Sequence, residues 1–331
     1  MTSTETLLLS RHDVRELLTL QDCIDAVERA FVLAARGAVP QPSVLGFPTT
    51  DGGFHIKAAA LDLGRRYFAA KLNGNFFRNR ERFGMPNIQG VVVLCDAENG
   101  LPLAVLDSIE ITILRSGAAT GVAARALSRP DSRVVTLCGC GNQGRVSLRA
   151  LKHVLALEKA YLWDVDPRAA AIMADEMKSE VGPALEVVAD FKDAARVSDI
   201  VVTCTPSKQA FLGVDDVRPG AFIAAVGADN EEKHEIEPAL MAAAKVVTDV
   251  TAQAADIGDL HHAIRAGVMS LPSVHAELGE VVGRLKPGRE SDDEIIIFDS
   301  TGTALQDVAA AALVYERARS AGRGSPFRFS E

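Results

Sequence analysis

A glycine-rich segment at residues 139–144 has the residue types and the spacing for binding phosphate groups. It follows the apolar run 134–138 and precedes a helix-period pattern of apolar residues that begins at Val146. In a G-x-G-x-x-G segment the first glycine permits a tight turn, the second lets the backbone approach a pyrophosphate, and the third lets the helix pack on the strand. Free N–H groups at the start of the helix would hold the phosphates. We therefore predict a dinucleotide site rather than an ordinary glycine-rich turn, formed by Gly139, Gly141, Asn142, Gln143 and Gly144.

An acidic residue follows at the distance that such a site requires. The second apolar run, 160–163, ends at Asp164, about twenty residues after Gly144. An acid at this place hydrogen bonds to the ribose 2′-hydroxyl and would repel a 2′-phosphate. Asp166 could be the ribose ligand instead, and Arg168 is close enough to accommodate a 2′-phosphate. The pattern favours NAD as the cofactor over NADP.

Small hydroxyl residues follow a later apolar run. Thr203 ends the run 200–203, and Thr205 and Ser207 come directly after it. A loop at the carboxyl end of a Rossmann-type strand can meet the cofactor, and small hydroxyl side chains suit that position. We predict that all three residues contact the cofactor; ordinary turn chemistry before Pro206 is the alternative.

An acid also follows the apolar run that ends at Val226. The segment continues through Gly227 and Ala228 to Asp229, at the strand end where the nicotinamide should lie. A carboxylate there could act as a general base or a proton carrier. We predict that Asp229 is catalytic and that Val226 lies at the cofactor. Capping of the helix expected near Glu237, or a surface position, is the alternative for Asp229.

Basic residues stand within apolar surroundings in the first third of the chain, at Lys57, Lys71 and Arg115. A charged side chain is costly to bury unless it is paired. A substrate carboxylate would be a natural partner, and arginine is suited to bidentate recognition of a carboxylate. A snorkelling side chain on a solvated face is the alternative at each position.

Composition excludes several classes of function. The net charge is −9 and no Lys/Arg cluster offsets it, which argues against a nucleic-acid surface. No window approaches the ~20 apolar residues of a membrane span, and the longest apolar run near the N-terminus is too short for a signal peptide. The five cysteines lack C-x-x-C spacing and indicate buried thiols in a reducing compartment. His261-His262 lacks the partners of a zinc site. We predict a soluble cytoplasmic protein without a metal ion.

The 331 residues are enough for two domains. Strand-like runs follow one another in the first third and indicate an antiparallel or mixed sheet: 54–60, 67–72, 90–95 and 103–106. Strand-like runs then alternate with helical intervals and predict a doubly wound parallel sheet: 134–138, 160–163, 200–203, 222–226, 245–248 and 295–298.

An alanine-rich helix near 304–319 follows the last of these runs and has no further strand to join. We therefore expect it to pack on the first domain, so that the nucleotide domain is an insertion. The predicted boundaries are 1–117 plus 304–331 for one domain and 118–303 for the Rossmann domain.

Seven segments in order carry a further pattern: 71–77, 85–90, 103–107, 111–115 with 118–120, 139–144, 226–229 and 298–304. With these segments the chain resembles the ornithine cyclodeaminase/mu-crystallin family along nearly its whole length. The resemblance implies an α/β fold in which a Rossmann-type doubly wound parallel sheet is inserted into an α+β domain. That second domain would bind the substrate and form a homodimer.

The resemblance also implies roles for individual residues. Lys71 and Arg115 would hold the carboxylate of the substrate, and Asp229 would handle protons or activate water, with Lys71 as a second catalytic candidate. The other substrate-binding candidates are His55, Lys57 and Asn75. The cofactor candidates that the resemblance implies are Asn142, Gln143, Asp164, Thr205 and Ser300, together with Thr120.

One departure from the family pattern bears on the substrate. Ornithine cyclodeaminases have an arginine after the proline near Pro42 and an acid near His55, whereas this chain has Ser43 and the run His55-Ile56-Lys57. A basic pair cannot attract a second ammonium group, so a carboxylate or a neutral imino acid suits it better than a diamine.

We therefore expect an NAD-dependent oxidoreductase acting on the C–N bond of a small amino or imino acid, like an alanine dehydrogenase or a ketimine reductase. The alternatives are an ornithine or lysine cyclodeaminase-type ammonia lyase and a non-catalytic mu-crystallin-like binding protein. Because Lys71, Arg115 and Asp229 are all present, the pattern argues against the last of these.

Overall fold

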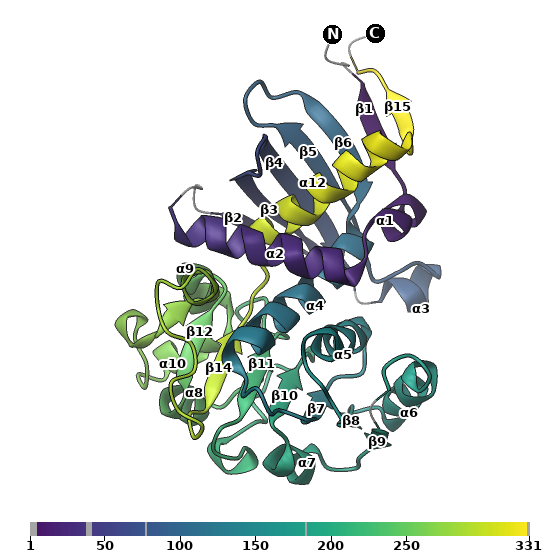
Figure 1. Ribbon diagram of the computed structural model, residues 1–331. Coiled ribbons are helices and arrows are strands. Elements are labelled where there is room, and N and C mark those ends of the chain that lie inside the picture. The colour runs from purple at the N-terminus through teal and green to yellow at the C-terminus, as the bar shows by residue number, and fades with distance from the viewer. Residues whose placement is uncertain (1–4, 38–41, 77, 183, 330–331) are drawn as a thin grey trace. The chain divides into compact units, whose positions relative to one another are not determined.

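The computed structural model describes residues 5–37, 42–76, 78–182 and 184–329 and divides into two compact units (Figure 1). Unit 1 comprises Met1–Arg115 and Thr303–Glu331, and unit 2 comprises Ser116–Gly302. Unit 2 is therefore inserted into the chain of unit 1.

In the described part of unit 1, seven strands form a mixed sheet in the order β15-β1-β6-β5-β4-β3-β2. Strand β1 is parallel to β6, and the other neighbours are antiparallel. The strands are β1 (Thr6–Leu9), β2 (Ser43–Thr49), β3 (Gly52–Asp62), β4 (Arg66–Asn75), β5 (Ile88–Asp96), β6 (Pro102–Asp107) and β15 (Ser325–Phe327). The sequence predicted β3 to β6 and a sheet of this kind.

Helices cover one face of this sheet (Figure 1). They include α1 (Arg11–Leu17), α2 (Leu20–Ala35) and α12 (Ala304–Ala321). The short α3 (Asn79–Phe83) lies between β4 and β5 along the chain. Helix α12 packs against α2, β3 and β4, as the sequence predicted for its alanine-rich segment. Its run of four alanines, 309–312, is buried, since small side chains let the helix approach its neighbours closely.

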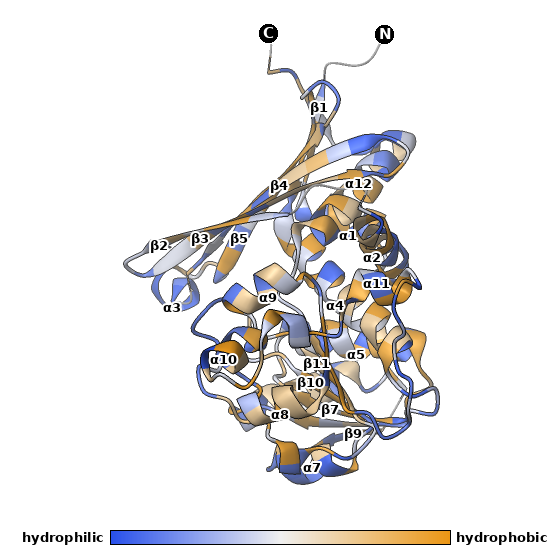
Figure 2. Cartoon of the chain, turned by 90° about the vertical axis from the view of Figure 1, so that its left-hand side faces the viewer, coloured by the Kyte–Doolittle hydropathy of each residue, from blue (hydrophilic) through white to orange (hydrophobic). Residues whose placement is uncertain are grey.

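The two faces of the sheet differ, as the alternation along β4 shows. Tyr67, Ala69 and Lys71 are buried on the face that α12 covers, which we call the inner face. Phe68 and Leu72 alternate with them and are exposed on the opposite, outer face. Hydrophobic and hydrophilic residues both occur along these strands (Figure 2). The inner face therefore holds a core with a lysine in it.

Among the described residues of unit 2, eight strands form a parallel sheet in the order β13-β12-β14-β11-β10-β7-β8-β9. The strands are β7 (Val134–Cys138), β8 (Lys159–Trp163), β9 (Ala184–Val187), β10 (Ile200–Thr203), β11 (Phe222–Ala225), β12 (Lys245–Thr248), β13 (Ala276–Glu277) and β14 (Ile296–Asp299). All six predicted strands are present, and the doubly wound parallel sheet is confirmed. Its chain order reverses between β7 and β10, where sheets of this type bind ligands.

Helix α4 (Ser108–Leu127) begins in unit 1 and continues into unit 2. The other helices of unit 2 connect its strands along the chain. They are α5 (Asn142–Val154), α6 (Pro167–Met177), α7 (Phe191–Val197), α8 (Pro238–Ala243), α9 (Thr251–Ile257), α10 (Asp259–Arg265) and α11 (Leu278–Val282), with short 3₁₀ turns at Val214–Asp216 and Leu271–Ser273. None of the helices in the described ranges is long and apolar enough to cross a membrane.

The cysteines are all free thiols. Cys23, Cys138 and Cys140 are buried, and Cys95 and Cys204 are partly buried. Burial raises the pKa of Cys23 and of Cys140 to about 12, so both thiols are neutral near pH 7.

Candidate active site

The predicted site residues fall into two groups, one carried by each unit. In unit 2 the glycine-rich loop connects β7 to α5. Gly139 has a φ of +109°, and a Cβ there would lie 2.8 Å from the carbonyl oxygen of Cys204. A Cβ at Gly144 would lie 2.1 Å from the carbonyl oxygen of Gly139, so α5 can approach this turn only with glycine at that position. A Cβ at Gly141 would meet nothing within 4 Å. The loop therefore leaves open space at Gly141, where a pyrophosphate would approach.

The start of α5 also suits an anion. Helix α5 begins at Asn142, and its N-cap Gly141 has no side chain to satisfy the first N–H groups. The side-chain oxygen of Gln143 is buried without a hydrogen-bond partner among the described residues; as an acceptor it would take a donor of the cofactor and not a phosphate oxygen. A helix N-terminus of this kind attracts phosphate through its N–H groups and its dipole. The loop and the helix together fit a dinucleotide.

Asp164 connects the glycine-rich loop to the end of β8. Its Oδ2 accepts a hydrogen bond from the Cys140 N–H at 2.8 Å, and its Oδ1 accepts one from the Asp166 N–H at 3.0 Å. Asp166 itself is the N-cap of α6, and its carboxylate pairs with the exposed guanidinium of Arg168 at 3.1 Å. Of the two acids, Asp164 is therefore the one that contacts the loop, and Asp166 serves its helix.

Buried Glu235 joins the loops that follow β10 and β11. Its Oε1 accepts hydrogen bonds from the backbone N–H and the hydroxyl of Thr205 at 2.6 and 2.7 Å. Its Oε2 accepts one from the Gly227 N–H at 3.0 Å. Burial raises the pKa of Glu235. Sequence reasoning missed Glu235, although an acid close to a candidate catalytic loop was a usable signal.

Asp229 lies in the loop after β11, with its side chain 47% exposed. Its Oδ1 lies 2.6 Å from Nζ of Lys233 and accepts a hydrogen bond from it. Helix α8 has Glu237 as its N-cap, so Asp229 does not cap that helix, which was one alternative. The structure thus presents Asp229 as an accessible carboxylate beside a lysine that sequence reasoning did not single out.

The remaining cofactor candidates lie at or near strand ends. Thr203 is buried at the end of β10 and accepts a backbone hydrogen bond from Val226. Ser207 donates its hydroxyl hydrogen to the Gln209 carbonyl at 2.7 Å. Ser300 follows β14, and its hydroxyl lies 3.5 Å from Asp249.

Thr120 differs from these candidates because it lies within α4. It is fully buried, and its hydroxyl donates to the Ser116 carbonyl at 3.3 Å. The Ser147 hydroxyl of α5 lies 3.5 Å away. The structure therefore places Thr120 in the packing of α4 on α5.

Three buried carboxylates, those of Glu235, Asp259 and Asp299, are linked through backbone N–H groups near these strand ends. Asp299 accepts hydrogen bonds from the N–H groups of Asp259 and Leu260 at 3.3 and 2.8 Å. Asp259 in turn accepts one from the Glu235 N–H at 2.8 Å. Burial raises the pKa of Asp299 to about 7 and that of Asp259 well above its usual value. No group of His, Cys, Asp and Glu side chains in the described ranges is arranged to hold a metal ion.

In unit 1, Lys71 and Arg115 converge on one carboxylate, that of Asp307 in α12. The Lys71 Nζ lies 2.9 Å from both carboxylate oxygens of Asp307, and the Arg115 Nε lies 3.3 Å from Oδ1. The neighbouring Gln306 accepts a hydrogen bond from Arg115 Nη1 at 2.9 Å. All four residues are buried. Two consecutive residues of α12 therefore hold the two predicted carboxylate-binding cations.

Strand β3 adds the other basic candidates. Lys57 stands directly opposite Lys71 in the antiparallel register, and His55 stands opposite Asn73. Lys57 is buried on the inner face. Asn75, at the end of β4, has a buried side-chain oxygen with no partner in the part of the chain that the structure describes.

The electrostatics of this group follow from burial and from charge. Burial lowers the pKa of Lys71 to about 7; Arg115 and Lys57 lower it further, and Asp307 opposes them. Burial alone would raise the pKa of Asp307, but Lys71, Arg115 and Lys57 outweigh that effect and lower it. Sequence reasoning missed Asp307 and Gln306. The signal was available, since two polar residues interrupt an apolar, alanine-rich helix.

These features define a protein with a Rossmann-type unit inserted into a mixed α/β unit that carries a buried cluster of cations. The sequence model of the ornithine cyclodeaminase/mu-crystallin family matches residues 4–322, and the chain belongs to this family.

Individual relatives are similar over nearly the whole chain. The alanine dehydrogenase of Archaeoglobus fulgidus is 37% identical over 98% of this chain and 99% of its own. An archaeal alanine dehydrogenase dimer, solved with bound NAD, has a TM-score of 0.94 and 37% identity over 98% of this chain and 99% of that one. The Δ¹-pyrroline-2-carboxylate reductase of Thermococcus litoralis, solved with NADH and L-proline, has a TM-score of 0.91 and 31% identity over 97% and 99%.

Proposed function

We propose that this protein is an NAD-dependent oxidoreductase that acts on the C–N bond of a small amino or imino acid. The observation that carries the proposal is the buried set of Lys71, Arg115 and Gln306 in unit 1. The Gln306 side-chain oxygen accepts a hydrogen bond from Arg115, and the amide Nε2 of Gln306 can still donate hydrogen bonds. That Nε2 is buried and has no partner in the described ranges. A buried donor without a partner is costly, and a bound carboxylate would satisfy it.

Each residue has a definite task in this proposal. Lys71 and Arg115 bind the substrate carboxylate: Arg115 has N–H donors beyond the two that contact α12, since a guanidinium has five, and Lys71 contributes its positive charge. NAD held at the glycine-rich loop and Asp164 would supply the hydride acceptor for oxidation at Cα of an amino acid, and NADH the hydride donor for reduction of an imine. Asp229 carries the proton and assists the water that releases ammonia in the oxidative direction. The open position at Gly141 and the acid at Asp164 support NAD as the cofactor.

The basic residues of β3 limit the choice of substrate. His55 and Lys57 stand on the strand beside Lys71 and Asn73. Cationic groups here disfavour a diamine such as ornithine, whose second ammonium would be repelled. The relatives support the same class, since they are named for acting on alanine and on Δ¹-pyrroline-2-carboxylate.

A two-way assay tests the proposal. The purified protein is incubated with NAD and each of L-alanine, L-proline, L-aspartate, L-ornithine and L-lysine, and both NADH absorbance and ammonia are followed. The reverse assay uses NADH with pyruvate plus ammonia, and with Δ¹-pyrroline-2-carboxylate. We expect NADH to form or to be consumed with at least one amino or imino acid other than the diamines.

Other outcomes assign the other functions. Release of ammonia from ornithine or lysine without net NADH would identify a cyclodeaminase. No turnover in either direction, with retained binding of NAD, would identify a mu-crystallin-like binding protein. Either result would contradict the proposal.

We also propose that the protein is a homodimer formed through the outer face of the unit 1 sheet. Large apolar side chains are exposed there on adjacent strands: Leu45, Phe47, Phe54, Phe68, Leu72 and Val91. The register places Leu45 opposite Ile56 and Ile56 opposite Leu72, so they form one continuous stripe. The archaeal relative solved as a dimer supports a second copy as the occupant.

Light scattering after size-exclusion chromatography tests this interface. The wild-type protein should have twice the mass of the chain, and Leu72→Glu should reduce it to a monomer. Val165→Glu is the matched control, because Val165 is an exposed residue of unit 2. A wild-type monomer, or a Leu72→Glu variant that stays dimeric, would contradict the proposed interface.

A further inference from the structure

We propose that Asp307 is a positioning residue, through which α12 holds Lys71 and Arg115 ready for a substrate carboxylate and keeps the Lys71 ammonium charged. The inference rests on the proposed function for the identity of the ligand. Asp307 lies in α12, far along the chain from both Lys71 and Arg115.

The first step is the cost of placing these cations together. Lys71 and Arg115 are 3% and 7% exposed, and Lys57 is 8% exposed on the adjacent strand. Like charges directly opposite in a sheet destabilise it, and each buried ammonium also loses its hydration. A carboxylate beside these cations offsets that cost before any substrate arrives. Asp307 is that carboxylate, because it lies within 3.3 Å of both Lys71 and Arg115.

The second step is geometry. Lys71 Nζ is centred on the carboxylate, 2.9 Å from each oxygen, and it also lies 3.4 Å from the Thr112 hydroxyl of α4. Arg115 is held on its Nε side by Asp307 and at Nη1 by Gln306. These contacts fix the direction of two long side chains that would otherwise have many rotamers. Arg115 uses only two of its five N–H donors in these contacts, so the others stay available for the ligand, and Lys71 adds its positive charge beside them.

The third step is charge. The charged groups that act on Lys71 are Lys57 from β3, Arg115 from α4 and Asp307 from α12, and of these only Asp307 favours the ammonium. From α2, Cys23 faces Arg115 and Asp307, but its thiol is neutral because burial raises its pKa to about 12. Without Asp307, burial and the two neighbouring cations would lower the pKa of Lys71 further, so that its side chain would be a neutral amine at neutral pH. The neutral amine would bind a carboxylate poorly.

A substrate-independent measurement tests this assignment. The ¹³Cε chemical shift of Lys71, assigned by comparison with Lys71→Met, is followed against pH by NMR in wild type and in Asp307→Asn. We expect a wild-type midpoint at about pH 7. In Asp307→Asn the midpoint should fall by about one to three pH units, as expected for loss of an adjacent opposite charge.

Kinetics supply the second readout, with the amino or imino acid that gives the highest rate in the two-way assay. Asp307→Asn should lower kcat/KM by about ten- to a hundredfold through KM and move the alkaline limb of its pH profile to lower pH by the same interval as the Lys71 midpoint. Affinity for NAD should not change. Asp307→Glu restores the charge and should bring the Lys71 midpoint back to the wild-type value.

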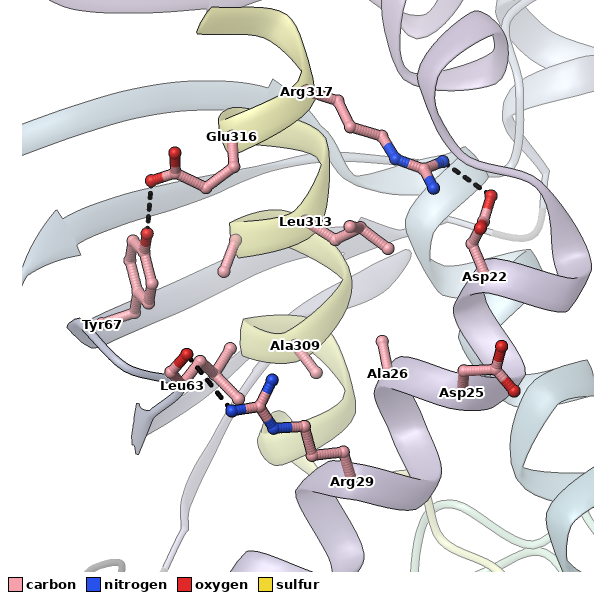
Figure 3. A pocket seen from close by; sticks show the side chains of 11 residues that line it. Asp22, Asp25, Ala26, Arg29, Leu63, Tyr67, Ala309, Leu313, Glu316 and Arg317 are labelled. Atoms are coloured by element: carbon pink, nitrogen blue, oxygen red, sulfur yellow. Dashed lines mark hydrogen bonds and ion pairs between the residues drawn. The ribbon is translucent and has the colours of Figure 1, made fainter. Parts of the chain in front are cut away.

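Asp22→Asn is the matched control. Asp22 of α2 pairs with Arg317, further along α12, at 2.6 Å, and this ion pair lines a separate cavity of unit 1 (Figure 3). The substitution removes one carboxylate from a partner on the same helix. It should leave the Lys71 midpoint and the pH profile of kcat/KM unchanged.

The outcomes separate the two proposals. If the Lys71 midpoint and KM are unchanged in Asp307→Asn, Asp307 is only part of the helix packing and the inference is wrong. If Asp307→Asn does not fold, Asp307→Glu decides, because a displaced carboxylate should raise KM, and an unchanged KM would overturn the inference. Absence of turnover with every amino and imino acid would contradict the proposed function alone, since the NMR titration needs no substrate.

Discussion

Lys57 and Lys71 stand directly opposite each other on β3 and β4, and both are buried on the inner face of the sheet. A directly opposed pair of like charges weakens a sheet, and burial adds the cost of desolvation. Such a pair is not explained by stability. It concentrates positive charge on one side of the sheet, where Asp307 supplies the opposing charge.

This relationship predicts how Lys57 controls the protonation of Lys71. Lys57 lowers the pKa of Lys71, so Lys57→Met should raise it above about 7. Lys71 would then stay charged to higher pH, and the alkaline limb of kcat/KM should move up, opposite in sign to the effect of Asp307→Asn. The ¹³Cε titration of Lys71 measures the shift directly. A midpoint that stays in place or falls would show that Lys57 does not act on Lys71 through charge.

Substitutions of Arg115 should weaken substrate binding. An ammonium cannot reproduce the planar, two-pronged contact of a guanidinium, so Arg115→Lys should be nearly as impaired as Arg115→Ala. Losing one charged hydrogen bond to the substrate costs roughly 1.5–3 kcal/mol, or about ten- to a hundredfold in kcat/KM. Steady-state kinetics of both variants test this. Wild-type kinetics in Arg115→Ala would remove Arg115 from the site.

The glycine-rich loop offers a pair of substitutions with opposite consequences. Gly144→Ala places a Cβ 2.1 Å from the Gly139 carbonyl oxygen and should destabilise the fold by about 1–3 kcal/mol or more. Gly141→Ala meets nothing within 4 Å, so it should leave the melting temperature unchanged and weaken the binding of NAD. Calorimetry and titration with NAD measure the two effects. If Gly141→Ala binds NAD as tightly as wild type, the pyrophosphate does not approach at Gly141.

Much of the fold could be predicted from the sequence because the central strands of unit 2 are buried on both faces. Such strands are continuous apolar runs, and β7, β10 and β12 have the predicted bounds. The edge strands could not be found in the same way. Strand β9 is mostly exposed and β13 has two residues, so neither has an apolar run to detect. Strand β2 was missed because its whole length is exposed and includes Gly46 and Pro48.

The candidate site was also predictable only in part, because some of its residues are close in sequence and others meet only in the folded structure. The glycine-rich loop is contiguous in sequence, so its spacing predicts its geometry. Asp307 was missed because its relation to Lys71 spans 236 positions of the chain, and only the packing of α12 on the sheet brings the two together. Glu235 was missed for the same reason, since it meets Thr205 across two loops. A polar residue within an apolar pattern indicates burial with a partner, but the sequence does not say which partner.

Asp164 leads to a prediction about cofactor choice. A carboxylate at the 2′ position repels a phosphate, so wild type should bind NAD(H) more tightly than NADP(H). Asp164→Asn keeps the size of the side chain and should shift the ratio of affinities toward NADP by roughly tenfold, or about 1.4 kcal/mol. Titration of both cofactors measures the ratio, with Asp166→Asn as the control. A wild-type preference for NADP would contradict this and indicate Arg168, which is exposed and pairs with Asp166.

Asp229 carries the last prediction, on the chemical step. Asp229→Asn keeps the size of the side chain and an acceptor for Lys233 but cannot carry a proton. If Asp229 is the acid/base, turnover should fall by about 10²–10⁴, and affinity for NAD should barely change. Asp193→Asn is the control, because Asp193 is an exposed acid of unit 2 in a comparable ion pair, with Arg196.

The two measurements together decide the role of Asp229. A parallel loss of NAD affinity in Asp229→Asn would mean that the Asp229–Lys233 pair supports the nucleotide loop and not the chemistry. Unchanged turnover would make Asp229 a surface residue, because Glu237 already occupies the N-cap of α8. The proton carrier would then have to be another titratable group, and Lys71 is the next candidate because burial brings its pKa to about 7.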